Sequence, residues 1–129
     1  NLQQKVLLTG FVNQQDVAAY YAAAHAFVMC SDYGETWGLS INEAMNFSLP
    51  IIASNRCGSV ADLVCDGENG YVFETGNISQ LEQAMRKLKN SSQQQLLSMG
   101  QKSLQLVNEH SFSSIANVLE RLNEIDQSS

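Results

Sequence analysis

Two glutamates that stand eight residues apart, Glu35 and Glu43, are the side chains of this sequence best placed to do chemistry. Trp37 and Gly38 lie between them, and Leu39 follows. An amphipathic helix is predicted to begin near Gly38, so its first turn offers unpaired backbone N–H groups and the positive end of the helix dipole. Because glycine has no Cβ, a ligand can approach this backbone closely, and a diphosphate could bind here without a lysine.

Glu43 stands one helical turn beyond Leu39, on the same face of the predicted helix. Its carboxylate could accept two hydrogen bonds from a vicinal diol such as a ribose, and Glu35 on the preceding loop could face whatever the diphosphate carries. Structural roles would also account for these residues. A glutamate near a helix N-terminus interacts favourably with the dipole by roughly 0.3–1 kcal/mol, and Trp37 could be a hydrophobic plug. Spacing alone leaves both interpretations open.

The segments around this stretch predict an α/β fold with a parallel sheet. Four apolar runs have the length of buried strands, and helical patterns separate them. Strands and helices in alternation imply parallel strands joined by right-handed crossovers, and ligands bind such sheets beyond the carboxyl ends of the strands. Both glutamates fall at that end. The predicted strands are residues 5–9, 26–30, 50–54 and 71–73, and the helices are residues 14–24, 60–64 and those beginning near 38, 77 and 92.

The last predicted helix carries a regular apolar stripe, which we expect to lie in a core or in an interface. The stripe consists of Ile115, Val118, Leu119, Leu122 and Ile125.

The composition is that of one ordinary domain of 129 residues with 44% hydrophobic residues. Seven basic residues against thirteen acidic ones give a net charge of -6, and without a basic cluster nucleic-acid binding is not expected. Three cysteines and two histidines in no ligand pattern argue against a disulfide framework and against a metal site. No apolar run has the length of a membrane span. Because the sequence begins at Asn1 and reaches a predicted strand almost at once, we expect it to be a piece of a longer chain.

Residues 35–45, ETWGLSINEAM, resemble the Glu-x7-Glu signature of the retaining, nucleotide-sugar-dependent glycosyltransferases of group one, also called family four. The resemblance extends over roughly residues 5–90. Each of its elements alone is a weak signal, but their order along the chain is specific to the family. The other matching elements are TGFV at 9–12, YYAAA at 20–24, the apolar strand up to Ser31, PIIAS at 50–54, Gly58 through Asp62, Val64, and DG and NG within 66–70.

The resemblance implies the GT-B architecture, in which two Rossmann-like halves face a cleft, and it makes residues 1–129 part of the nucleotide-sugar-binding C-terminal domain. It implies that Glu43 holds the ribose hydroxyls and that Glu35 acts near the reaction centre as the catalytic residue. The backbone of Gly38 and Leu39 would hold the diphosphate, with Trp37 in the same substrate site.

Such enzymes use no metal and no cofactor, because protein dipoles and basic side chains carry the leaving-group charge. The resemblance further implies transfer of a sugar from a nucleotide diphosphate to an acceptor glycan, lipid or other small molecule, with retention of configuration. We expect a cytoplasmic protein whose complete form could associate peripherally with a membrane.

Three residues depart from the family pattern. Ser48 stands where the family often has glycine, and a left-handed backbone there would cost serine on the order of 1 kcal/mol. Ser59 replaces the second residue of a Gly-Gly pair, and Asp62 replaces a glutamate. The last two changes lie in the stretch that closes the donor site, so they leave the identity of the sugar open.

The acceptor domain and the first two strands of the donor domain have no counterpart in the sequence. In a sheet of order 3-2-1-4-5-6, those strands would lie between residues 5–9 and residues 26–30. We therefore expect an incomplete sheet, a rearranged pairing, or self-association that fills the gap. We also expect no transferase activity from this chain alone.

Three other functions are compatible with parts of the pattern. A nucleotide-sugar epimerase of the same architecture would need a carboxylate and a histidine from its other domain. A non-catalytic nucleotide-binding remnant would keep the fold alone. A flavodoxin-like receiver would need an acidic cluster and a late lysine; Asp32 follows a strand, but no matching lysine is present.

Overall fold

The computed structural model describes residues 1–32, 38–110 and 114–127. Its centre is a three-stranded parallel sheet in the order β1-β2-β3. The strands are β1 (Phe27–Met29), β2 (Ile51–Ser54) and β3 (Gly70–Phe73). Phe27 lies opposite Ile51, and Ile51 lies opposite Gly70. The predicted α/β fold with a parallel sheet is confirmed, and three of the four predicted strands are present.

Helices surround the sheet, and their starts follow the capping residues of the sequence. The side chain of Asn13 accepts a hydrogen bond from the Asp16 backbone at 3.0 Å, and Ser92 and Gln95 form a reciprocal capping box. The helices of the described residues are η1 (Leu2–Gln4), α1 (Gln14–Ala23), α2 (Leu39–Asn46), α3 (Val60–Leu63), α4 (Ile78–Asn90), α5 (Gln93–Asn108) and α6 (Ser114–Gln127).

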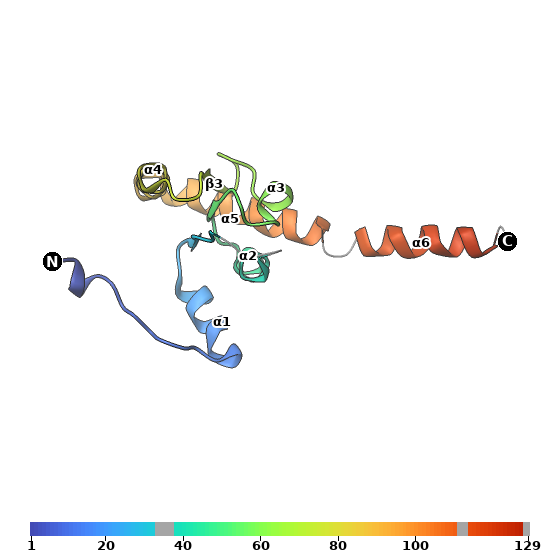
Figure 1. Ribbon diagram of the computed structural model, residues 1–129, viewed down its shortest axis with the longest axis horizontal. Coiled ribbons are helices and arrows are strands. Elements are labelled where there is room, and N and C mark those ends of the chain that lie inside the picture. Colours follow the sequence, from blue (N-terminus) through green and yellow to red (C-terminus); the bar gives the residue numbers. More distant parts are fainter. Residues whose placement is uncertain (33–37, 111–113, 128–129) are drawn as a thin grey trace.

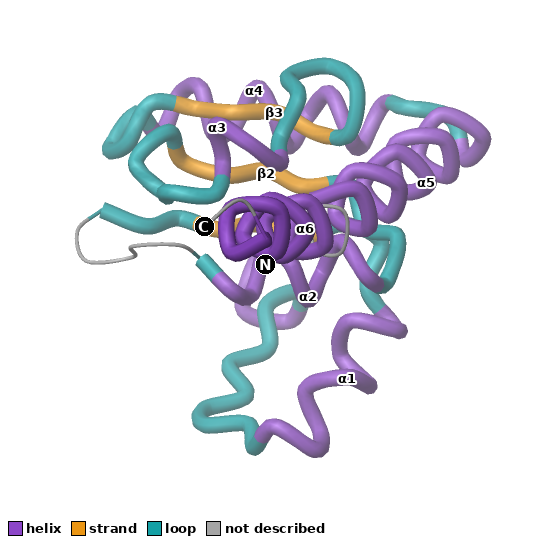
Figure 2. Tube along the Cα trace, turned by 90° about the vertical axis from the view of Figure 1, so that its right-hand side faces the viewer, coloured by secondary structure: helices purple, strands orange, loops and turns teal. Residues whose placement is uncertain are grey.

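The central strand β2 is buried on both faces, which explains its uninterrupted apolar sequence. Ile51 and Ala53 belong to a core shared with α2, α3 and α5, whereas Ile52 belongs to a second core built mainly with α4. Figure 1 shows these helices gathered around the strands, and Figure 2 shows β2 and β3 side by side. The sheet therefore fixes α2, which carries Glu43, relative to the ends of all three strands.

The strand predicted at residues 5–9 is wrong. These residues form no strand, and Leu7 and Leu8 are 81% and 90% exposed. A β-strand is stable only when its backbone groups are paired, and no described residue pairs with this segment or with the outer edge of β1. Of the three expected outcomes, the described part of the chain shows an incomplete sheet.

The described apolar side chains of α6 do not lie in a core, so of the two expected locations the interface stays a prediction. Ile115, Val118, Leu119 and Leu122 are 56–62% exposed, and the helix projects away from the rest of the molecule in Figure 1. Periodicity identifies the apolar face of a helix, but it does not show what covers that face.

None of the helices in the described ranges has the length and apolar character needed to cross a membrane.

Ser48 has the left-handed backbone that its departure from glycine suggested, with φ of 55°. We expect Ser48→Gly to raise the free energy of unfolding by up to about 1 kcal/mol. Relief of about 1–2 kcal/mol of strain exceeds the extra unfolded-state entropy of glycine, about 0.5–1 kcal/mol. Urea unfolding measures the change. Ser48→Ala is the matched control, because it keeps the Cβ and should gain nothing; an equal gain in both variants would assign the cost to the hydroxyl instead.

Candidate functional site

The N-terminus of α2 is the best-defined candidate anion site of the described chain. Gly38 forms its N-cap in a left-handed conformation, with φ of 78° and ψ of 60°, and no side chain caps the helix. Its carbonyl accepts a hydrogen bond from the Ile41 backbone at 2.9 Å. Leu39, the first helical residue, is 69% exposed. The first turn therefore combines the positive end of the dipole with N–H groups that no side-chain cap occupies.

Gly38 is required for a reason that the sequence analysis did not identify. A Cβ added to it would lie 2.4 Å from Cys57 Sγ and 3.3 Å from Ser59 Oγ. Cys57 and Ser59 are buried and follow β2. The absence of a side chain at Gly38 thus leaves the space that the Cys57 and Ser59 side chains occupy. The loop after β2 therefore packs directly against the start of α2.

Glu43 is half-buried on α2 and accepts a hydrogen bond at Oε2 from the Tyr21 hydroxyl, with an oxygen–oxygen distance of 3.0 Å. Tyr21 comes from α1 and is only 8% exposed. Its ring lies 5.8 Å from the Phe27 ring and 5.5 Å from the Phe47 ring, centroid to centroid. The carboxylate predicted from the sequence is therefore held by an aromatic cluster that joins α1, β1 and α2.

Sequence reasoning missed Tyr21 as part of the candidate site, because it included this residue only as part of the YYAAA element at 20–24. The available signal was chemical. A buried tyrosine usually finds a hydrogen-bond partner for its hydroxyl, but the sequence does not show which acidic side chain comes within reach.

Burial, together with the hydrogen bond to Glu43 and its negative charge, raises the pKa of Tyr21 from 10.0 to about 12. The folded state thus favours the neutral phenol. The neutral Tyr21 phenol contributes fully to the stability of the folded state below pH 10, the pKa of tyrosine in the unfolded chain. This contribution is lost as the pH rises through about 12, the pKa in the folded state.

We expect the free energy of unfolding to fall over this alkaline range, and to fall less in Tyr21→Phe. Urea unfolding of both proteins at about pH 9 and about pH 11 tests this, because the raised pKa acts only in the protein that has the phenol. The same pH dependence in both proteins would contradict the assignment.

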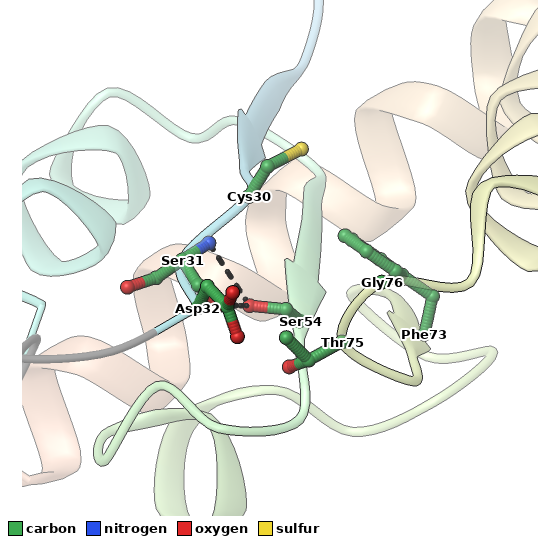
Figure 3. A pocket seen from close by; sticks show the side chains of 7 residues that line it. All are labelled: Cys30, Ser31, Asp32, Ser54, Phe73, Thr75 and Gly76. Atoms are coloured by element: carbon green, nitrogen blue, oxygen red, sulfur yellow. Dashed lines mark hydrogen bonds between the residues drawn. The ribbon is translucent and has the colours of Figure 1, made fainter.

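A small pocket lies at the carboxyl ends of the three strands, where the parallel fold predicts ligands (Figure 3). Ser54 Oγ closes one side of it by donating to the Ser31 carbonyl at 2.7 Å and accepting from the Ser31 backbone N–H at 3.1 Å. At about 130 Å³ it is smaller than the roughly 300–1,000 Å³ typical of small-molecule sites, so it could hold only a group of a larger ligand. The lining residues are Cys30, Ser31, Asp32, Ser54, Phe73, Thr75 and Gly76.

The predicted site residues are distributed as follows. Gly38, Leu39 and Glu43 lie together on the first turns of α2. Glu35 and Trp37 lie outside the described residues, so their predicted roles stay predictions.

Known proteins resemble this chain over most of its length. The family described as Glycosyl transferases group 1 matches residues 1–105. Sulfoquinovosyl transferase SQD2 of Arabidopsis thaliana is 32% identical over 85 residues, which are 64% of this chain and 16% of the relative. The 2-deoxystreptamine N-acetyl-D-glucosaminyltransferase of Niallia circulans is 33% identical over 93 residues, which are 71% of this chain and 23% of the relative. The chain thus spans less than a quarter of either relative.

Solved structures share the fold. TarM matches with a TM-score of 0.77 and 25% identity, over 95% of this chain and 24% of TarM. The C-terminal domain of a group 1 glycosyl transferase, LpcC from Francisella tularensis, matches with a TM-score of 0.71 and 24% identity, over 84% of this chain and 57% of that chain. The parallel sheet and its helices are thus those of a GT-B C-terminal domain, and the receiver alternative is wrong. With the family match over residues 1–105, the chain belongs to the glycosyl transferases of group 1.

Proposed function

We propose that the first turns of α2 bind the nucleotide diphosphate of a sugar donor, and that the complete protein transfers this sugar to an acceptor with retention of configuration. One observation carries the proposal. An uncapped helix N-terminus at Gly38 and a carboxylate held in place at Glu43 lie one helical turn apart on α2.

The diphosphate half of the proposal rests on the backbone. The N–H groups near Leu39 and the dipole of α2 favour an anion, and no acidic residue in the first turn opposes it. These groups also stabilise the nucleoside diphosphate as it leaves, so the proposed reaction needs no metal.

The ribose half rests on Glu43. An ionised carboxylate has about four lone-pair positions, and of the described residues only Tyr21 uses one of them. Enough acceptor capacity remains for the two hydroxyls of a ribose. A carboxylate offers these hydroxyls charge-assisted bonds, which are stronger than bonds between neutral groups.

The sugar half of the site is proposed from the sequence. Glu35 is the catalytic residue and Trp37 lines the substrate site, as the family resemblance implies. The names of the two relatives mention different sugars and different acceptors, so membership of the family leaves both open. The acceptor class that we propose is a glycan, a lipid or another small molecule, and the proposed location is the cytoplasm.

The test begins with calorimetric titration of the complete protein with UDP, GDP and ADP. We expect one of them to bind with saturation. Sugar donors that contain the bound nucleotide are then assayed for transfer, and NMR of the product reports the anomeric configuration. Failure of all three nucleotides to bind would overturn the proposal. Inversion would overturn retention, and conversion of the donor without transfer would favour the epimerase. Residues 1–129 alone are expected to transfer no sugar.

A further inference from the structure

We propose that Tyr21 is a positioning residue. It holds the Glu43 carboxylate in the orientation that accepts hydrogen bonds from both ribose hydroxyls. It thereby sets the preference of the site for ribonucleotides over deoxyribonucleotides. The inference rests on the proposed function, because it concerns the same carboxylate. It adds a residue from a different helix, α1, to the site on α2.

The phenol has little freedom of its own. The Tyr21 ring stacks on Phe47, with 27° between the ring planes, and lies at 58° to Phe27. Phe47 caps the C-terminal end of α2, and Phe27 begins β1. Two separate elements thus hold the ring, and its hydroxyl meets Glu43 Oε2 at 3.0 Å.

This hydrogen bond matters because Glu43 must bind two hydroxyls at once. A glutamate side chain on a helix surface samples several rotamers, and only one orientation presents both of its oxygens to a vicinal diol. By accepting from Tyr21 at Oε2, the carboxylate keeps one orientation before the nucleotide arrives, so less freedom is lost on binding. Without the phenol, the second ribose bond is the one most easily lost.

Deoxynucleotides separate this role from a general contribution to folding. A nucleotide that lacks the 2′ or the 3′ hydroxyl makes only one bond to Glu43, so it benefits little from a fixed carboxylate. If Tyr21 supported only the fold, its loss would weaken ribonucleotides and deoxynucleotides by the same factor.

The experiment compares Tyr21→Phe with the wild type in the complete protein. Phenylalanine keeps the ring between Phe27 and Phe47 and removes only the hydroxyl. Calorimetry measures Kd for UDP, GDP and ADP and for their 2′-deoxy and 3′-deoxy forms. We expect the variant to bind the preferred ribonucleotide about tenfold more weakly and its deoxy forms less than about twofold more weakly. The ratio of the deoxynucleotide Kd to the ribonucleotide Kd is therefore expected to be smaller in the variant than in the wild type.

Tyr20→Phe is the matched control, because it makes the same change one residue away, on a tyrosine that is 49% exposed. It should leave both Kd values unchanged. In a Glu43→Ala background, Tyr21→Phe should have almost no further effect on the ratio, because the side chain that it positions is gone. Circular dichroism and Tm verify that each variant is folded.

The outcomes separate the two proposals. If the wild type binds none of the nucleotides, the proposed function fails, and this inference fails with it. If the wild type binds one of them and Tyr21→Phe leaves the ratio unchanged, the positioning role alone is refuted. An equal loss for ribonucleotides and deoxynucleotides would reduce Tyr21 to a structural residue.

Discussion

Glu43→Gln is expected to weaken binding of the preferred nucleotide by roughly 30- to 150-fold. Hydrogen bonds to a charged group contribute about 1.5–3 kcal/mol and those between neutral groups about 0.5–1.5 kcal/mol. Replacing two charged bonds to the ribose by neutral ones therefore costs about 2–3 kcal/mol, at 1.4 kcal/mol for each tenfold change in Kd. The substitution conserves the size of the side chain, and a neutral amide oxygen can still accept from Tyr21, so the fold should persist.

Calorimetry of the complete protein with the preferred nucleotide measures this effect. Glu120→Gln is the control, because it makes the same change in charge on an exposed position of α6. We expect the control to bind as the wild type does. A loss smaller than about threefold in Glu43→Gln would place the ribose elsewhere, since not even one charged bond would then have been removed.

Gly70→Ala is expected to have the largest effect on the fold, a loss of at least about 3 kcal/mol. A Cβ at this position would lie 1.7 Å from the Ile51 carbonyl oxygen and 2.8 Å from the Ile51 nitrogen. These are backbone atoms of the neighbouring strand, so no side-chain rotation relieves the overlap. β3 must move away from β2, and the bond from the Ile51 N–H to the Asn69 carbonyl, 3.0 Å long, is lost.

Against a total stability of about 5–15 kcal/mol for a typical domain, such a loss leaves a marginal protein. Urea unfolding followed by circular dichroism measures it. Gly67→Ala is the matched control from the same turn, because a Cβ there meets nothing within 4 Å and only its φ of 82° is unfavourable. The control should lose about 1–2 kcal/mol. Equal losses of unfolding free energy in both variants would show that the close approach of β2 and β3 does not determine the cost of a side chain at Gly70.

The two effects are connected through the architecture of the site. β2 leads into the loop of Cys57 and Ser59, which supports Gly38 at the start of α2. Displacing β3 from β2 should therefore also disturb the proposed diphosphate site, whereas Glu43→Gln should change binding without changing the fold.

Local patterns in the sequence were sufficient to predict most of the helices and strands and the position of one candidate site residue, Glu43. The helices predicted at residues 14–24 and from near residue 92 are present, and Asn13 and Ser92 cap them with their side chains. The apolar run of β2 is a central strand, because only a strand covered on both faces is apolar throughout. The start of α2 at Gly38 and the position of Glu43 on its second turn also follow from local sequence.

Features that depend on neighbouring residues, such as helix caps, turns, apolar faces and the spacing along α2, can be predicted from the sequence. Features that require a distant partner depend on how the elements pack. Residues 5–9 have the composition of a strand, but no described residue pairs with them. Tyr21 is an aromatic residue of the kind found in protein cores, yet its hydroxyl donates a hydrogen bond to Glu43, which lies 22 positions away in the sequence. A hydrogen bond between side chains of two helices depends on how those helices pack, and no periodicity within either helix contains that information.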